Sequence, residues 1–65
     1  MPDNIIYRVK IWTAYEGDIE YECDGTRPGA LIRALELSRE KPGVRVNVKQ
    51  DACVAYARDG ALTTL

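Results

Sequence analysis

Carboxylates occupy every second position in the stretch EGDIEYECD. They are Glu16, Asp18, Glu20, Glu22 and Asp24, half of the ten acids in the chain. In an extended strand, alternate residues lie on one side at intervals of about 6.6 Å. The stretch therefore predicts a strand with one acidic face, which we call the acidic ladder. Three kinds of chemistry follow from such a row: acid–base catalysis, cation binding, and imitation of a nucleic-acid backbone.

Catalysis and metal binding fit the ladder poorly. Catalytic carboxylates need surroundings that separate their pKa values, and solvated neighbours on one open strand have similar surroundings. Calcium sites gather oxygens around a curved loop, whereas a flat strand spreads them in a row. The chain also has no histidine, and its two cysteines, Cys23 and Cys53, lack the spacing of a zinc site and are expected to be free thiols. We therefore predict no enzymatic activity, no metal and no cofactor.

Size and charge limit the remaining classes. Sixty-five residues suffice for one small domain, residues 1–65, in which 46% of residues are hydrophobic. The net charge of −1 lacks the basic footprint typical of a nucleic-acid-binding protein. No apolar run approaches the ~18 residues of a membrane span. We expect a soluble, cytoplasmic protein without direct contact to nucleic acid or membrane.

Residues 5–13 alternate between apolar and polar side chains and predict a strand that pairs with the ladder. A three-residue loop, residues 15–17, would give Gly17 the left-handed conformation that such loops favour. This register would pair the apolar side chains of the two strands, and on the wet face it would place Trp12 opposite Glu20, Lys10 opposite Glu22 and Arg8 opposite Asp24. The acids without a basic partner would then be Asp18 and Glu20, beside Trp12 at the hairpin tip.

The rest of the chain predicts a helix and further strands. Thr26 is a typical helix N-cap, and Pro42-Gly43 ends the helical period of residues 28–41. Strands follow at 44–49 and 52–58, and residues 61–65 form a short edge strand or fray. In the strand 52–58, one loop length buries Cys53, Ala55 and Ala57; we favour the other, which buries Val54 and Tyr56 and so removes more apolar area from water. The order β-β-α-β-β predicts an α+β fold, an antiparallel-rich sheet with one amphipathic helix packed on one face.

The ladder has two interpretations. One is the solvated side of an amphipathic strand. The other is imitation of DNA, although one DNA strand carries a charge per ~3.4 Å and a single ladder reaches about half that density. Trp12 is of a type enriched in interface hot spots, unless it shields the hairpin or meets the C-terminal tail. The predicted partner-binding residues are Trp12, Glu16, Asp18, Glu20, Glu22 and Asp24.

The order of elements resembles that of small inhibitors made by bacteriophages. Type I anti-CRISPR proteins include chains of this length and layout, and VAYARDG (54–60) is similar to the penultimate strand and turn of one of them. The resemblance implies a monomer in the host bacterial cytoplasm that binds a subunit of the Cascade surveillance complex and blocks target DNA binding. The acids that match this pattern are Asp18, Glu20, Glu22 and Asp24. The layout also resembles phage inhibitors of host RNA polymerase, and a self-associating structural or regulatory module is a further alternative.

Overall fold

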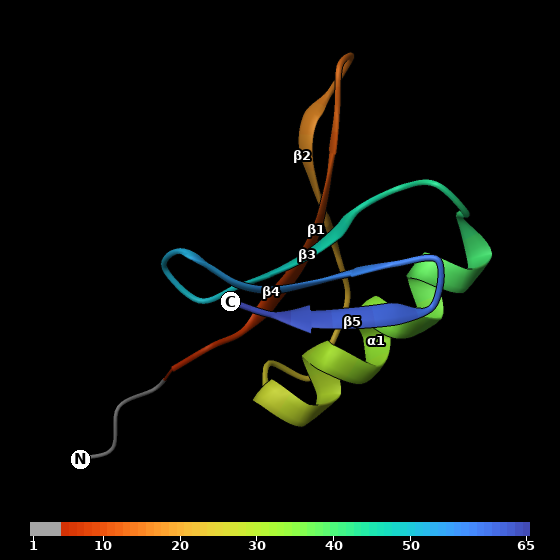
Figure 1. Cartoon of the computed structure of the whole chain (residues 1–65). Helices are drawn as coiled ribbons and strands as arrows, with labels where there is room; N and C mark the ends of the chain where they lie inside the picture. Colours follow the sequence, from red (N-terminus) through yellow and green to blue (C-terminus); the bar gives the residue numbers. More distant parts are fainter. Residues whose placement is uncertain (1–4) are drawn as a thin grey trace.

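A five-stranded sheet with one helix forms the part of the chain that the structure describes, residues 5–65 of a computed structural model (Figure 1). The strand order is β2-β1-β3-β4-β5, and all neighbouring strands are antiparallel. The predicted α+β fold is confirmed, and the C-terminal segment forms a fifth strand. The elements in chain order are β1 (Arg8–Thr13), β2 (Gly17–Tyr21), α1 (Arg27–Glu40), β3 (Val46–Lys49), β4 (Cys53–Arg58) and β5 (Ala61–Thr64).

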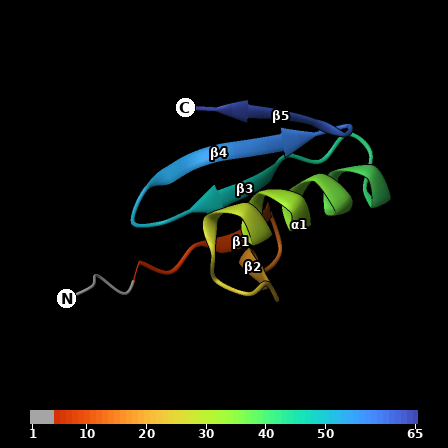
Figure 2. The same cartoon turned by 90° about the horizontal axis from the view of Figure 1, so that it is seen from below.

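Helix α1 runs along one face of the sheet (Figure 2). It contacts β1, β3, β4 and β5 but not β2. The buried side chains between helix and sheet are small or β-branched, with Leu37 the largest. Because alanines from both layers are fully buried, the helix lies close to the strands. The buried hydrophobic residues are Val9, Ile11, Ala30, Ala34, Leu37, Val46, Val48, Ala55 and Ala57.

The helix begins and ends where its sequence signals predict. The Thr26 hydroxyl accepts a hydrogen bond from the backbone N–H of Gly29 at 3.1 Å, which satisfies one of the free N–H groups of the first turn. Beyond Glu40, Gly43 takes a positive φ of 81°. Among L-residues that conformation is costly, so a glycine here allows the chain to turn back toward β3.

Strand β4 faces the opposite way from the favoured prediction. A three-residue loop does join β3 to β4, because Lys49 pairs with Cys53. A bulge then shifts the register, so that Val48 pairs with Ala55 instead of Val54. The alanines consequently point to the helix, and Tyr56 lies on the other face. The prediction that Val54 and Tyr56 are buried was wrong, because a bulge adds a residue to one strand and reverses the alternation beyond it.

Ser38 connects α1 to the turn between β4 and β5 through a hydrogen bond. Its side chain is fully buried, and its hydroxyl donates to the carbonyl of Leu35 at 2.8 Å. The same oxygen accepts from the backbone N–H of Gly60 at 2.9 Å, in the turn between β4 and β5. Asp59 binds the other side of this turn to the helix end, since its Oδ1 accepts from the N–H of Gly43 at 2.7 Å. The turn that positions β4 and β5 is thus held by two side-chain hydrogen bonds.

Candidate functional site

The β1–β2 hairpin projects beyond the helix and the rest of the sheet (Figure 1). Its strands pair in a register two residues away from the predicted one: Ile11 lies opposite Ile19, and Trp12 opposite Asp18. The loop is therefore residues 14–16, and Gly17, with a φ of 73°, is the first residue of β2. Within β1 and β2 the face of each side chain agrees with the prediction because a shift of two residues preserves the alternation, but the cross-strand partners were wrong, and Glu22 and Asp24 lie beyond the end of β2.

Thr13 explains the observed register. Its hydroxyl accepts from the backbone N–H of Glu16 at 2.9 Å and donates to the carbonyl of Gly17 at 3.5 Å. The side chain therefore closes the turn one residue earlier than the glycine alone suggests. A Thr or Ser before a loop is a recognisable turn signal, and attention to it would have favoured this register.

Two aromatic side chains stand exposed at the hairpin tip. Tyr15 is 99% exposed and Trp12 is 64% exposed. Glu16 is also exposed in the turn, and Asp18 faces Trp12 across the strands. We call these four residues, Trp12, Tyr15, Glu16 and Asp18, the tip surface. The sequence prediction included all of them except Tyr15, which it assigned to the loop without a function.

The acids of the ladder separate into different environments. Asp18 forms an ion pair with Lys49 of β3, with Oδ2 and Nζ 3.9 Å apart. Glu20 pairs with Arg8, with Oε1 and Nη1 3.7 Å apart. Glu22 is exposed beyond the end of β2 and has no ion pair within residues 5–65. The predicted pairings of Lys10 with Glu22 and of Arg8 with Asp24 were wrong, as the register requires.

Asp24 accepts hydrogen bonds from Thr26 at the start of the helix. Its Oδ1 accepts from the backbone N–H of Thr26 at 2.9 Å and from the Thr26 hydroxyl at 2.8 Å. The hydroxyl bond and then the backbone bond hold the pKa of Asp24 below its ordinary value, because both favour the charged carboxylate. Asp24 is thus bound to the backbone at the N-terminus of α1, away from the hairpin tip.

The sheet face opposite the helix is basic over its central strands. The burial of Val9, Val48 and Ala57 on the helix side directs their neighbours along each strand to the open side. Among the described residues, no helix covers this face. We call the cations on it the basic strip: Arg8 and Lys10 of β1, Arg45 directly before β3, Lys49 at the end of β3, and Arg58 of β4. Sequence reasoning missed the strip because it requires the strand order.

Arg45 has three side-chain contacts on the open face. Its guanidinium lies 3.9 Å from the centroid of the Tyr56 ring, and its Nε donates to Oδ1 of Asn47 at 2.8 Å. Its Nη2 is 3.9 Å from the sulfur of Cys53. Cation–π stacking and a hydrogen bond together fix the plane of the guanidinium. Cys53 and Cys23 are free thiols, as predicted.

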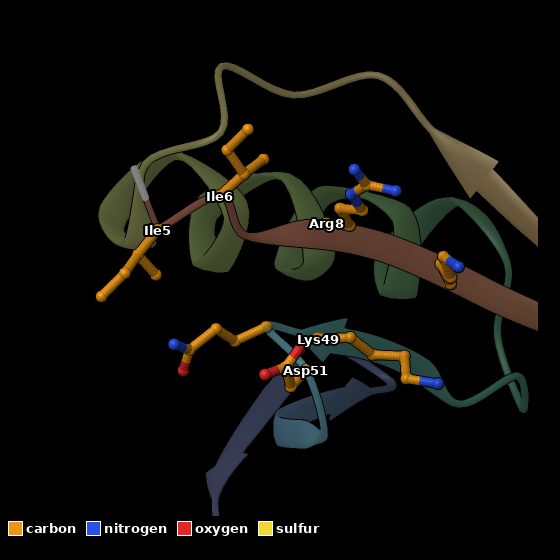
Figure 3. Close-up of a pocket in the computed structure, with 7 residues that line it drawn as sticks. Ile5, Ile6, Arg8, Lys49 and Asp51 are labelled. Carbon is orange, nitrogen blue, oxygen red and sulfur yellow. The ribbon is translucent and has the colours of Figure 1, made fainter. Parts of the chain in front are cut away.

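A hollow of about 530 Å³ lies at one end of the basic strip (Figure 3). Arg8 and Lys10 line it from β1, and Lys49 lines it from β3. Its remaining walls come from the residues before β1 and after β3: Ile5, Ile6, Gln50 and Asp51. The hollow therefore combines three cations with one carboxylate.

Among the described residues, no group of three or more Cys, Asp or Glu side chains is arranged to hold a metal ion. The helix of residues 27–40 is neither long nor apolar enough to cross a membrane, and it is the one helix in the described part. Comparison of the chain with protein-family models, with curated proteins and with solved structures gave no match.

Proposed function

We propose that this protein is a non-enzymatic inhibitor that binds a partner protein through the tip surface. The observation that supports this most is the exposure of Trp12 and Tyr15 on a hairpin that projects from the domain. Neither side chain belongs to the hydrophobic cluster under the helix, so the exposure of both aromatics has no explanation in packing. Exposed aromatic residues on a projecting hairpin are typical of contact surfaces.

The acids of the hairpin suit a basic partner. Asp18 and Glu20 form ion pairs at 3.9 and 3.7 Å, and all four side chains concerned are between 34% and 53% exposed. Pairs of this kind contribute about 0–1 kcal/mol in solution. A partner can therefore exchange its own Arg or Lys for the intramolecular cation at little cost. Glu16, exposed in the turn, adds a third carboxylate.

The target class that we propose is a protein complex that grips nucleic acid, specifically a subunit of the type I Cascade complex. This choice rests on the resemblance in layout to type I anti-CRISPR proteins and on the acidic residues at the tip. Occupation of a positively charged surface by the tip would block its contact with target DNA. Host RNA polymerase is the alternative target of the same class.

Binding of a purified Cascade complex to the immobilised protein tests this proposal, with host RNA polymerase in a parallel measurement. Replacement of a hot-spot residue weakens binding by 2 kcal/mol or more, about 30-fold. We expect Trp12→Ala and Tyr15→Ala each to reach this loss, and Asp18→Lys with Glu16→Lys to slow association. Arg27→Ala, on the helix, is the matched control. Equal affinity of the tip variants and the wild type would refute the proposed surface.

A self-associating module is the second candidate, and the β5 edge favours it. Strand β5 lies at the edge of the sheet, and its sequence ALTT has no charged residue and no proline. Natural sheets protect exposed edges with such residues, so an unprotected edge is a site for pairing with another strand. Light scattering at micromolar concentration separates the candidates. A monomer supports the inhibitor, and a dimer lost in Thr63→Lys supports self-association.

A further inference from the structure

We propose that the basic strip binds single-stranded nucleic acid through its phosphates. This inference does not depend on protein binding by the tip surface, because its cations lie on the central strands of the open face; Trp12 is shared and contributes only a stacking plane. It also departs from the expectation, based on the net charge, that the protein does not contact nucleic acid directly. The net charge of −1 sums over all sides of the molecule, whereas a ligand meets the charge of one face.

Charge is segregated between the central strands of the sheet and the rest of the chain, which includes the edge strand β2. Residues 8–13, 45–49 and 53–58, which form β1, β3 with Arg45, and β4, contain five cations and no carboxylate. All ten acids lie elsewhere in the chain. Because the helix-facing positions of these strands are apolar, all five charges project to the open side. The central strands thus form a basic surface on the open side, next to Asp18 and Glu20 of the edge strand β2.

Two of these cations occupy cross-strand positions that are unfavourable for the sheet by themselves. Arg8 and Lys49 are direct cross-strand partners between β1 and β3. Like charges in that position destabilise a sheet. The exposed ion pairs with Glu20 and Asp18, at 3.7 and 3.9 Å, offset part of this repulsion, and a phosphate between the two cations would offset it further. Both side chains also line the hollow (Figure 3).

The basic strip has room for a short stretch of nucleic-acid backbone. With neighbouring strands about 4.8 Å apart, β1 and β4 are separated by about 10 Å, and four residues along β1 cover about 13 Å. Lys10 and Arg58 form no ion pair with acids in residues 5–65, so both are available to a ligand. Arg8 and Lys49 form exposed pairs with acids, at 3.7 and 3.9 Å, that a phosphate can replace.

The aromatic residues favour a single strand over a duplex or an acidic peptide. Proteins that bind single strands combine a basic groove with planar groups on which bases stack. Trp12 is exposed on the same face as the strip. The Arg45 guanidinium is stacked on Tyr56 at 3.9 Å on one side, and its other side is a second planar surface for a base. A polyglutamate chain would use the charges but not these planes.

Fluorescence anisotropy with labelled dT12 and rU12 oligonucleotides tests the proposal. For single strands, the logarithm of affinity falls with the logarithm of salt concentration with a slope of about −0.7 per phosphate contact. Three to five contacts predict a slope between about −2 and −3.5, or a loss of roughly 20- to 130-fold between 50 and 200 mM salt. Because the proposed contacts are with phosphates, DNA and RNA are expected to bind alike.

Variants connect this binding to named residues. Lys10→Gln and Arg58→Gln should each reduce the slope by about 0.7, since each removes one phosphate contact. Arg27→Gln removes the same charge from the helix and should leave the slope unchanged. Tyr15→Ala should leave the affinity for the oligonucleotide unchanged and lower the affinity for the protein partner. One proposal can therefore be refuted without the other. Circular dichroism melts establish that each variant is folded.

Four results would overturn the inference. The first is the absence of binding at 50 mM salt, and the second is an Arg27→Gln variant that changes the slope as much as Lys10→Gln does. The third is equal affinity for polyglutamate of the same charge, which would assign the strip to an acidic protein. The fourth is equal affinity for duplex DNA, which would remove the contribution of the exposed planar groups.

Discussion

Replacement of Ser38 by alanine is expected to loosen the turn that carries β4 and β5. The change removes the hydroxyl that accepts from Gly60 N–H at 2.9 Å and donates to the carbonyl of Leu35 at 2.8 Å. The Leu35 carbonyl loses only an additional bond inside the helix. The Gly60 N–H, by contrast, loses its partner in a half-buried turn.

The magnitude follows from two opposing terms. An unsatisfied buried donor costs about 1–3 kcal/mol, and the half-buried position of Gly60 favours the lower part of that range. Alanine is a better helix former than serine by up to about 0.5 kcal/mol. The net loss is therefore about 1 kcal/mol, from a total stability of about 3–10 kcal/mol for a chain of this length.

Thermal unfolding followed by circular dichroism measures this loss as a decrease in Tm of about 4–8 °C. Amide hydrogen exchange at Gly60 provides the specific readout, because its protection in the wild type should fall in Ser38→Ala. Thr63→Ala is the control, since it deletes a hydroxyl from an exposed position of β5. A Tm within about 2 °C of the wild type, together with unchanged exchange at Gly60, would refute the reasoning.

Two further predictions concern the hairpin and the helix start. Gly17→Ala should lower Tm by about 5 °C, because an L-residue at φ 73° costs about 1 kcal/mol although its Cβ would contact nothing. Gly17→Asn should lower Tm by less. Equal Tm values for the wild type and both variants would contradict the strain argument. The pKa of Asp24 is lowered on folding, so its contribution to stability is present above its ordinary pKa of 3.8 and lost as the pH falls through the folded value. Urea unfolding between pH 2 and 6 should show a weaker acid dependence in Asp24→Asn, and identical profiles would contradict it.

The sequence was sufficient to predict the elements and which face of most strands is buried. Alternating apolar residues specify a face without knowledge of the partner strand, so Val9, Ile11, Val46 and Val48 were assigned correctly. The helix could be predicted equally well because its start at Thr26 and its end near Pro42-Gly43 are local signals. These features depend on neighbours in the chain.

The candidate site was predicted only in part because it depends on neighbours across the sheet. The partner of Asp18 is Lys49, which lies 31 residues away in sequence and on the far side of β1. No local pattern reveals that contact, since it requires that β3 pairs with β1. The facing of Tyr56 was predicted wrongly for a related reason. The bulge between Val48 and Lys49 is a tertiary feature, and the fold buries the small alanines of β4 instead of the larger apolar area of Val54 and Tyr56.

The strand order has a consequence for how the two proposed surfaces act together. Asp18 and Glu20 belong to the hairpin, and their ion-pair partners, Lys49 and Arg8, belong to the basic strip. A basic partner protein that engages the two acids would free the two cations. A nucleic acid that engages the cations would equally free the acids. By linkage, each ligand should then raise the affinity of the other by the same factor.

The size of this coupling is limited by the strength of the pairs. Each exposed pair contributes about 0–1 kcal/mol, so two pairs can change affinity by up to about 30-fold, and severalfold is expected. Asp18→Asn with Glu20→Gln imitates the engaged state, because it removes both acids without a partner. We expect this double variant to bind dT12 severalfold more tightly than the wild type at 50 mM salt, with a smaller difference at 200 mM as screening increases. Glu36→Gln with Glu40→Gln, which removes two acids from the helix, is the matched control for net charge. Equal gains from the two double variants would show that total charge governs binding, and the two surfaces would then be independent.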